Sequence, residues 1–165
     1  MNSVLGIDPG TATTGYGLIS ESRNGLELIS YGVISTSPDL PMEKRLQIIY
    51  KRMIEIIDLH QPDSCAVEKL FFQRNVTTAI SVGQARGVIL LALAERDIKC
   101  AEYTPLEVKQ AVTGYGVANK KQVQIMVQAL LDLPEIPKPD DASDALAIAI
   151  CHAHSKRIND LHSLS

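Results

Sequence analysis

Two acidic residues stand at the ends of short apolar runs, where a strand would leave them facing water. Asp8 follows residues 4–7 and precedes Pro9, which cannot extend a strand ladder. Glu68 follows residues 64–67 in the same way. Open α/β sheets bind their ligands at the carboxyl ends of their strands. An aspartate before Pro and Gly also fits an ordinary turn. Further acids in the chain favour a functional site.

Two of these acids, Asp141 and Asp144, lie at the start of an alanine-rich apolar segment. Their i, i+3 spacing would put both carboxylates on one face of a helix. The rest of the segment is almost entirely apolar or small, so this face should lie against the sheet. Asp141 alone is explained by the preference for acids in a first helical turn. Asp144 is harder to explain, because burying an unpaired carboxylate is costly.

Four clustered carboxylates would repel one another and would need a compensating positive charge. The neighbouring bases are too few and too exposed to supply it, which favours a divalent metal ion. Oxygen ligands without His or Cys at metal spacing favour Mg²⁺ or Mn²⁺ over zinc. Two such ions roughly 4 Å apart would align a water or hydroxide with a phosphodiester and stabilise the departing 3′ oxygen. The acids therefore indicate metal-dependent phosphodiester chemistry.

Length and composition limit the number of domains and the kind of protein that the chain can form. With 165 residues, the chain predicts one domain at residues 1–158 and a frayed tail at residues 159–165. A hydrophobic content of 45% with 21% charged residues is typical of a soluble globular protein. We find no apolar run that would span a bilayer and no signal peptide, so we expect a cytoplasmic protein. Cys65, Cys100 and Cys151 are expected to be reduced core thiols.

Charge is unevenly distributed along the chain. The segment from Lys69 to Lys121 has eight basic and four acidic residues, a net charge of +4. The net charge of the whole chain is −3, so the remainder carries −7. A chain that gathers carboxylates at a metal site and bases around it can be acidic overall and still bind phosphates.

Apolar residues alternate in some segments, as in strands, and recur every three or four residues in others, as in helices. The chain is therefore predicted to contain both strands and helices. We expect strands at residues 4–8, 15–20, 26–36, 64–68 and 99–103. We expect helices at residues 42–60, 76–96, 105–112, 120–131 and 140–157. The Asn24-Gly25 pair predicts a hairpin, so the first three strands should form an antiparallel meander. A right-handed crossover would return the fourth strand beside the first, bringing Asp8 and Glu68 to one sheet edge.

Loops and helix ends add to this expectation. Residues 11–17 are small and glycine-rich, so a phosphate could approach the main chain there. Thr104 with Glu107, and Asn119 with Gln122, predict capping boxes that open two helices. Lys120 and Lys121 lie at a helix amino end, the wrong sign for the helix dipole. Each lysine therefore needs another partner, for which phosphate is one candidate.

The order of motifs along essentially the whole chain resembles the RuvC family of bacterial crossover junction endonucleases. The matching residues are Ile7-Asp8-Pro9-Gly10, Thr14-Gly15-Tyr16-Gly17, Ala66-Val67-Glu68 with Phe71, Gly83-Gln84-Ala85-Arg86-Gly87, Val108-Lys109-Gln110, residues 114–120 and residues 141–149. The resemblance implies a ribonuclease H-like α/β fold, with a five-stranded mixed sheet of three antiparallel and then two parallel strands, flanked by helices.

The resemblance also implies an activity and partners. It implies a homodimer that resolves four-way Holliday junctions in DNA recombination and repair. Each subunit would make one Mg²⁺-dependent nick, with two ions per site and Mn²⁺ able to substitute. The nicks would fall in strands of like polarity and leave 5′-phosphate and 3′-hydroxyl ends. The junction-binding protein RuvA and the branch-migration motor RuvB are the implied protein partners.

By the same resemblance, particular residues acquire roles. The implied catalytic metal-binding acids are Asp8, Glu68, Asp141 and Asp144, and the implied active-site lysines are Lys109 and Lys120. Phe71 is implied to stack on an unpaired base near the crossover, whereas Phe72 could instead pack in the core. The other expected DNA contacts are Lys69, Arg74, Arg86 and Lys121. Asp140 matches no family acid, so we expect it to be a cap or dipole partner at its helix end.

Two equal cuts on a two-fold junction are simplest from two copies of one site, which supports a dimer. We expect its interface on the helix near residues 83–93.

Three other functions compete with this interpretation. Actin-like and sugar-kinase-like ATPases also open with a strand, an Asp and a glycine-rich hairpin, but they need a second domain that 165 residues cannot provide. A non-catalytic nucleic-acid module would leave the position of the acids unexplained. Another ribonuclease H-like nuclease, acting on RNA or an RNA–DNA hybrid, is the nearest alternative, and fold alone does not distinguish it.

Overall fold

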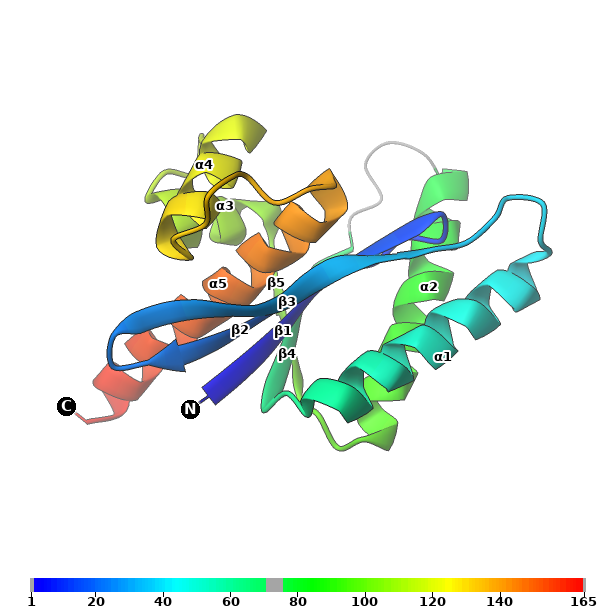
Figure 1. The fold of residues 1–165 in the computed structure, drawn as a ribbon, viewed down its shortest axis with the longest axis horizontal. Helices are drawn as coiled ribbons and strands as arrows, with labels where there is room; N and C mark the ends of the chain where they lie inside the picture. The colour runs from blue at the N-terminus through cyan, green and yellow to red at the C-terminus, as the bar shows by residue number, and fades with distance from the viewer. Residues whose placement is uncertain (1, 71–75, 165) are drawn as a thin grey trace.

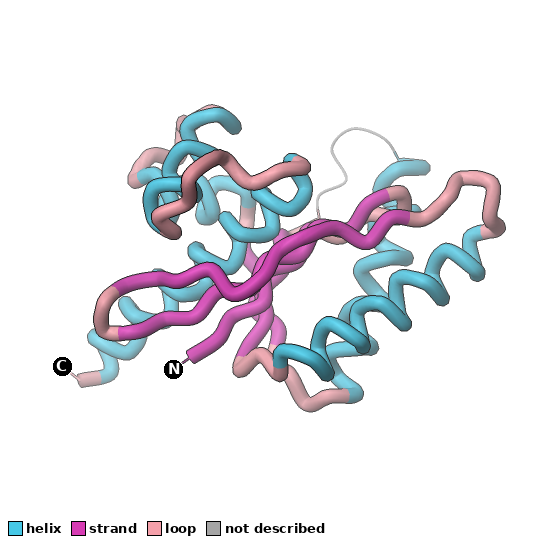
Figure 2. Tube along the Cα trace, in the orientation of Figure 1, coloured by secondary structure: helices cyan, strands magenta, loops and turns pink. Residues whose placement is uncertain are grey.

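Within residues 2–70 and 76–164, which the computed structural model describes, five strands form one mixed sheet with helices on both faces (Figure 1, Figure 2). The strands are β1 (Asn2–Asp8), β2 (Thr13–Ser22), β3 (Gly25–Ser35), β4 (Ser64–Glu68) and β5 (Cys100–Tyr103). The helices are α1 (Met42–His60), α2 (Val76–Glu95), α3 (Pro105–Thr113), α4 (Lys120–Leu130) and α5 (Asp140–Ser163).

The sheet has the order β3-β2-β1-β4-β5. The first three strands are antiparallel, and β4 and β5 run parallel to β1. The predicted fold class is therefore confirmed. Ile7 pairs with Val67 across the β1–β4 ladder, so Asp8 and Glu68 follow at the same carboxyl edge, as predicted. The β2–β3 turn also matches, with Gly25 at a positive φ of 120°.

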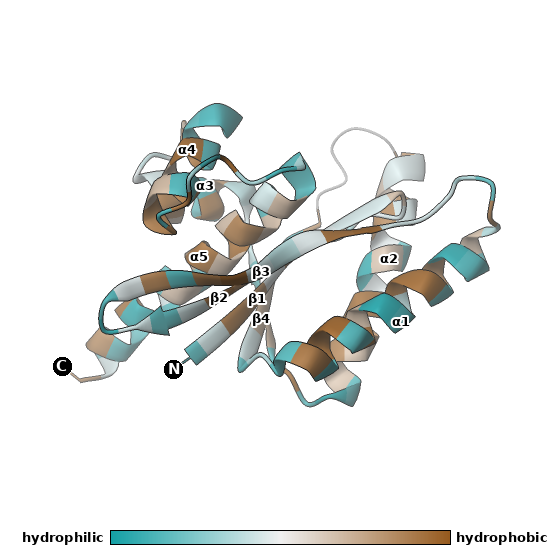
Figure 3. Ribbon diagram, in the orientation of Figure 1, coloured by the Kyte–Doolittle hydropathy of each residue, from teal (hydrophilic) through white to brown (hydrophobic). Residues whose placement is uncertain are grey.

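Two apolar layers bury the two faces of the sheet. Leu5 and Ile7 of β1 pack with Ile49 of α1 and Ile89 of α2 on one face. Val4 of β1 faces the other way, into a layer formed mainly with α5. Figure 3 shows the corresponding alternation of hydrophobic and hydrophilic residues along α1. Because β1 is buried on both faces, it is the central strand that its apolar run predicted.

Helix α5 lies unusually close to the sheet because glycines face it. A methyl group at Gly6 would collide with the carbonyl oxygen of Ala145, and one at Gly15 would collide with that of Asp141. A methyl group at Gly17 would overlap the side chain of Leu146. The prediction that this segment admits a phosphate is wrong for Gly15 and Gly17, because α5 occupies that space. We call Gly6, Gly15 and Gly17 the glycine seam.

The helix ends follow local sequence rules in most places. Helix α1 has the predicted bounds, and both predicted capping boxes, at Thr104 and Asn119, are present. The predicted end of α5 near Arg157 is too early. The helix continues to Ser163, so residues 159–163, expected as a frayed tail, are helical and exposed. The segment after Arg157 contains neither Pro nor Gly, and nothing local stops the helix.

The composition of α2 differs from our expectation that no segment could span a bilayer. By length and hydropathy alone, Val76–Glu95 is sufficient to do so. Apolar core helices of soluble proteins meet the same criteria, so composition alone does not show whether α2 crosses a membrane. One face of α2 packs in the core through Ala85, Ile89, Ala92 and Leu93. The same helix leaves other apolar residues exposed.

The glycine seam generates a prediction about stability. Gly6→Ala should destabilise the protein by about 1–3 kcal/mol or more, because the added methyl group meets rigid α5 backbone. Gly83→Ala in α2 is the control, since its methyl group would meet only Cδ2 of Leu70 at 3.6 Å, an ordinary van der Waals distance. Its cost should stay below about 1 kcal/mol. Urea denaturation at one protein concentration measures both, and equal costs would contradict the role given to Gly6.

Candidate active site

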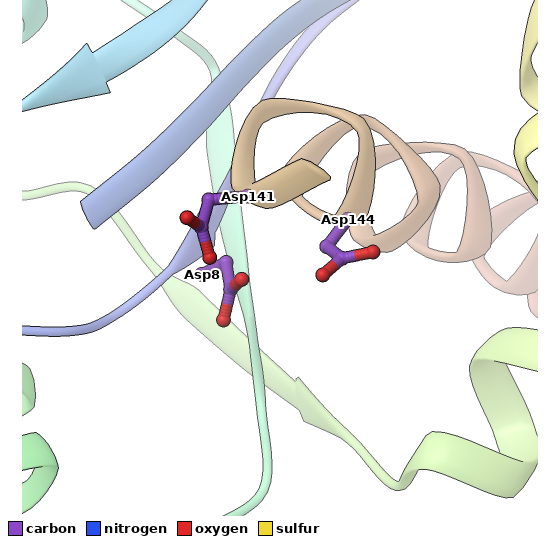
Figure 4. A group of neighbouring side chains, drawn as sticks. All are labelled: Asp8, Asp141 and Asp144. Atoms are coloured by element: carbon purple, nitrogen blue, oxygen red, sulfur yellow. The ribbon is translucent and has the colours of Figure 1, made fainter. Parts of the chain in front are cut away.

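Three aspartates converge at the carboxyl edge of the sheet. Asp8 ends β1, and Asp141 and Asp144 lie on the first turns of α5, one turn apart. Each offers a carboxylate oxygen, and these oxygens all lie within 4.8 Å of one another. Figure 4 shows the side chains of the strand residue and the two helix residues meeting in one place. Glu68, at the end of neighbouring β4, lines the same cavity as Asp8 and Asp144.

That cavity has a volume of about 220 Å³ and is built from five elements. Lys109 of α3 and Lys120 of α4 line it opposite the acids. Apolar side chains complete the wall: Pro105, Val108, Val123, Ala147 and Ile148. Four predicted acids and two predicted lysines are thus brought together from distant parts of the chain.

Crowding of the acids perturbs their protonation. Burial raises the pKa of Asp8 to about 8, and the charges of Asp144, Asp141 and Glu68 add to the shift. Burial also raises the pKa of Glu68, helped by Asp144 and opposed by Lys109. For Asp144, burial raises the pKa and Lys120 opposes it. Without an added positive charge, the acids cannot all be ionised near neutral pH.

The donor set fits a metal ion. The clustered ligands are carboxylate oxygens, which hard divalent cations prefer. A cation would relieve the repulsion that raises the pKa of Asp8. The acidic cluster of Asp8, Asp141 and Asp144 can therefore bind a metal ion.

Lys120 has partners that the sequence did not predict. Its Nζ lies 3.4 Å from Oδ2 of Asp144 and 3.3 Å from Oδ2 of Asp140. Burial alone would lower the pKa of Lys120, but the charges of Asp144 and Asp140 outweigh it and raise the pKa. These acids compensate for the unfavourable position of the lysine at a helix amino end.

The loop after Asp8 is held by hydroxyl groups. Oγ1 of Thr11 donates a 2.9 Å hydrogen bond to the carbonyl oxygen of Ser81 in α2. Oγ1 of Thr36 donates to the carbonyl oxygen of Thr11 at 2.6 Å, and Nε of Arg45 in α1 donates to Thr36 at 2.8 Å. Both α1 and α2 therefore anchor the segment that positions Asp8. Sequence reasoning missed these contacts, because they join residues with no shared motif.

The remaining predicted residues are placed as follows. Phe71, Phe72 and Arg74 lie outside the described residues. Lys69 is exposed directly after Glu68, and its backbone N–H donates to Tyr103 at 2.7 Å. Lys121 is exposed beside a groove that adjoins the site.

Arg86, also expected to contact DNA, pairs with an acid of the sheet. Its side chain is only 15% exposed and forms an ion pair with Glu102 of β5. Its buried Nε has no hydrogen-bond partner among the described residues. The ion pair does not test the expected DNA contact of Arg86, which stays a prediction.

Of the two roles expected for Asp140, a cap or a dipole partner, the structure excludes the cap. The N-cap of α5 is Pro139, and no side chain caps the helix. Asp140 lies in the first turn, where an acid suits the dipole, but its carboxylate contacts Lys120 and Gln124 of α4. Lys120 and Gln124 are four residues apart and so share one face of α4. The sequence gives no sign that this face lies beside Asp140, because the contact depends on how α4 and α5 pack.

Comparison with known proteins agrees with the geometry. Residues 4–152 match the sequence model of the family described as crossover junction endodeoxyribonuclease RuvC. The chain is 59% identical over 150 residues to the crossover junction endodeoxyribonuclease RuvC of Desulforamulus reducens, covering 91% of this chain and 92% of the relative. It is 54% identical over 154 residues to the protein of the same name from Thermotoga petrophila, covering 93% of each.

Solved structures give the same result. The chain is similar to Thermus thermophilus RuvC in complex with a Holliday junction substrate, with a TM-score of 0.88, 36% identity and 96% of each chain covered. A further structure of Thermus thermophilus RuvC matches with a TM-score of 0.90 and 38% identity, covering 95% of this chain and 96% of the other.

The raised pKa of Asp8 generates a prediction about stability and pH. Between about pH 4 and pH 8 the native metal-free protein holds a proton on Asp8 that the unfolded chain has lost, so stability falls as pH rises. In chelator at pH 8, Asp8→Asn should therefore raise the urea midpoint, and the difference should vanish near pH 4. The exposed Asp39→Asn is the control. The same pH dependence in Asp8→Asn and the parent would disprove the assignment.

Proposed function

The chain belongs to the RuvC family of crossover junction endodeoxyribonucleases, and we propose how its residues carry out that activity. It is an endonuclease that resolves Holliday junctions, with the ribonuclease H-like fold of that family. The observation that carries the proposed mechanism is a cavity lined by three acids and two lysines, with Asp141 in the same cluster as Asp8 and Asp144.

The reaction that this site supports best is hydrolysis of one phosphodiester in each of two strands of like polarity. Symmetric nicks of this kind would leave 5′-phosphate and 3′-hydroxyl ends. Asp8, Asp141 and Asp144 would hold divalent cations, with Glu68 as a further ligand from β4. Mg²⁺ is the proposed ion, two per site, and Mn²⁺ would substitute. When bound, the ions supply the charge that activates water and stabilises the leaving oxygen.

Lys109 and Lys120 would bind the phosphate group and offset its charge. Both line the cavity that contains the acids, from α3 and α4 respectively. Lys69, Arg74, Arg86 and Lys121 are proposed as general phosphate contacts, and Arg86 would exchange its ion pair with Glu102 for the phosphate. Phe71 is proposed to stack on an unpaired base, on the strength of the family resemblance.

We propose that the active form is a homodimer joined through α2. A stripe of this helix has apolar and glycine positions that the described residues leave uncovered. Val76 is 70% exposed, Ile80 55% and Leu91 54%, and a methyl group at Gly87 would meet no atom within 4 Å. Their spacing places all four within one narrow face of the helix. A second copy would bury this face and present a second site to a two-fold symmetric junction.

The cellular setting follows from the substrate. Four-way junction DNA in recombination and repair places the enzyme in the bacterial cytoplasm, where the thiols of Cys65 and Cys151 remain reduced. RuvA and RuvB are the proposed protein partners, since they bind and move the same junction.

Cleavage specificity is the first prediction of this proposal. A labelled four-way junction should receive paired, symmetric nicks in Mg²⁺ and none in chelator, while a linear duplex and an RNA–DNA hybrid stay intact. Asp8→Asn should abolish cleavage and leave junction binding within about twofold, because binding depends mainly on phosphate contacts. Cleavage of the hybrid would instead favour a general ribonuclease H-like nuclease. Full activity of Asp8→Asn would remove the acidic cluster from the mechanism.

The dimer gives a second prediction. Leu91→Asp should convert the protein to a monomer, because it places a charge in the proposed interface. Single nicks should then replace paired nicks. Leu59→Asp on α1 is the control, since Leu59 is 77% exposed and lies on another helix. Sedimentation velocity and strand-specific gels measure both results. A dimeric Leu91→Asp protein would place the interface elsewhere.

A further inference from the structure

Asp140 joins the amino ends of two helices. One carboxylate oxygen, Oδ2, lies 3.3 Å from Nζ of Lys120. The other, Oδ1, accepts a 3.2 Å hydrogen bond from Nε2 of Gln124. Lys120 and Gln124 are one turn apart on α4, and Asp140 is the first residue of α5. The carboxylate therefore bridges two α4 side chains with one oxygen for each.

Lys120 is shared between two acids with different surroundings. Asp144 belongs to the acidic cluster and also lines the cavity. Among the described residues, Asp140 belongs to neither set; it lines the adjoining groove instead. A divalent cation on Asp144 would compete for its carboxylate and repel the ammonium of Lys120. Asp140 would then be the acid that retains its attraction for the lysine.

The helix ends favour this arrangement. The first turn of α4 contains no acid, so the ammonium of Lys120 lies at the positive end of the helix dipole. Asp140 brings a negative charge to this point while remaining in the first turn of its own helix. The side chains of Lys120 and Asp140 are 56% and 67% exposed. A contact so exposed adds little to folding stability, so it can be removed without unfolding the protein.

We propose that Asp140 is a positioning residue that holds Lys120 at the edge of the acidic cluster when a divalent cation is bound to Asp144. Gln124 orients the carboxylate so that Oδ2 faces the lysine. The proposal rests on the proposed function, in which Lys120 contacts the phosphate being cleaved. A lysine already held near that phosphate loses less freedom when it binds, which favours the transition state.

A double-mutant cycle tests the proposal. The four proteins are the parent, Asp140→Asn, Lys120→Ala and the double variant, compared by single-turnover junction cleavage in saturating Mg²⁺. Asp140→Asn should slow cleavage about fivefold, the scale expected for one exposed ion pair. Junction affinity in chelator should change less than about twofold, because general phosphate contacts remain. In the Lys120→Ala background, Asp140→Asn should have no further effect.

Three further variants test whether the charge of Asp140 and its orientation by Gln124 are responsible. Asp140→Glu keeps the charge and should restore most of the lost rate, and Gln124→Ala should reproduce part of the loss. Glu135→Gln is the charge control, because Glu135 is an exposed acid that lines the same groove as Asp140. It should cleave at the parent rate.

A second readout follows the lysine directly. In Mg²⁺, an amine-reactive reagent should label Lys120 faster in Asp140→Asn than in the parent, as measured by peptide mass spectrometry. Labelling of neighbouring Lys121 should not change, which makes it an internal reference. Equal labelling of Lys120 in the two proteins would overturn the proposal.

The outcomes separate the proposal from the function on which it rests. If Lys120→Ala is impaired but Asp140→Asn slows both backgrounds equally, Asp140 acts through charge at the metal site and the positioning role is wrong. If Lys120→Ala cleaves at the parent rate, the role of Lys120 in the proposed function fails, and the role of Asp140 fails with it.

Discussion

Repulsion among carboxylates at one sheet edge is the constraint around which this fold is arranged. Burial, together with the charges of the neighbouring acids, raises the pKa of Asp8 to about 8. Such a cluster persists only when the surrounding structure holds it in place. The buried strand β1 supplies one acid. Helix α5 supplies two, and its central turns pack against the sheet. The apolar core therefore supplies most of the energy that keeps the acids together, and the contact of Lys120 with Asp144 adds to it.

The lysines complete the same electrostatic design. Lys109 and Lys120 come from α3 and α4, which pack against α5 on the face opposite α1 and α2 (Figure 1). They partly offset the negative charge, yet Lys120 remains more than half exposed. A phosphate could therefore reach it from solvent. The two helical layers therefore differ in what they expose. The layer with α3 and α4 carries the lysines of the cavity, and the layer with α2 carries the exposed apolar face.

Sequence was informative where the determining contacts are local. The capping boxes at Thr104 and Asn119 and the i, i+3 pair on α5 each depend on residues a few positions apart, so pattern alone located them. The convergence of Asp8 with Glu68 needed only one topological rule, the right-handed crossover. The order of residue types along the chain therefore suffices to predict the acidic cluster and the family.

Features that depend on distant partners were not accessible. Arg86 carries the charge expected of a DNA contact, but only the fold shows that Glu102 engages it. Gly15 and Gly17 suggested room for a ligand, but the space belongs to α5. Asp140 suggested a cap or a dipole partner, and nothing in the sequence indicates that α4 also lies beside it. In each case the residue type permitted the expected role, but the neighbour that decides it was unknown from sequence.

The glycine seam has an evolutionary consequence. Gly6, Gly15 and Gly17 perform no chemistry, yet any larger side chain there would push α5 outward and carry Asp141 and Asp144 away from Asp8. Selection for catalysis therefore acts on positions that never touch the substrate. Replacing glycine by alanine is a common route to greater thermostability in other proteins, but at the seam the added methyl groups would meet α5. Adaptation to heat must proceed through other parts of the molecule.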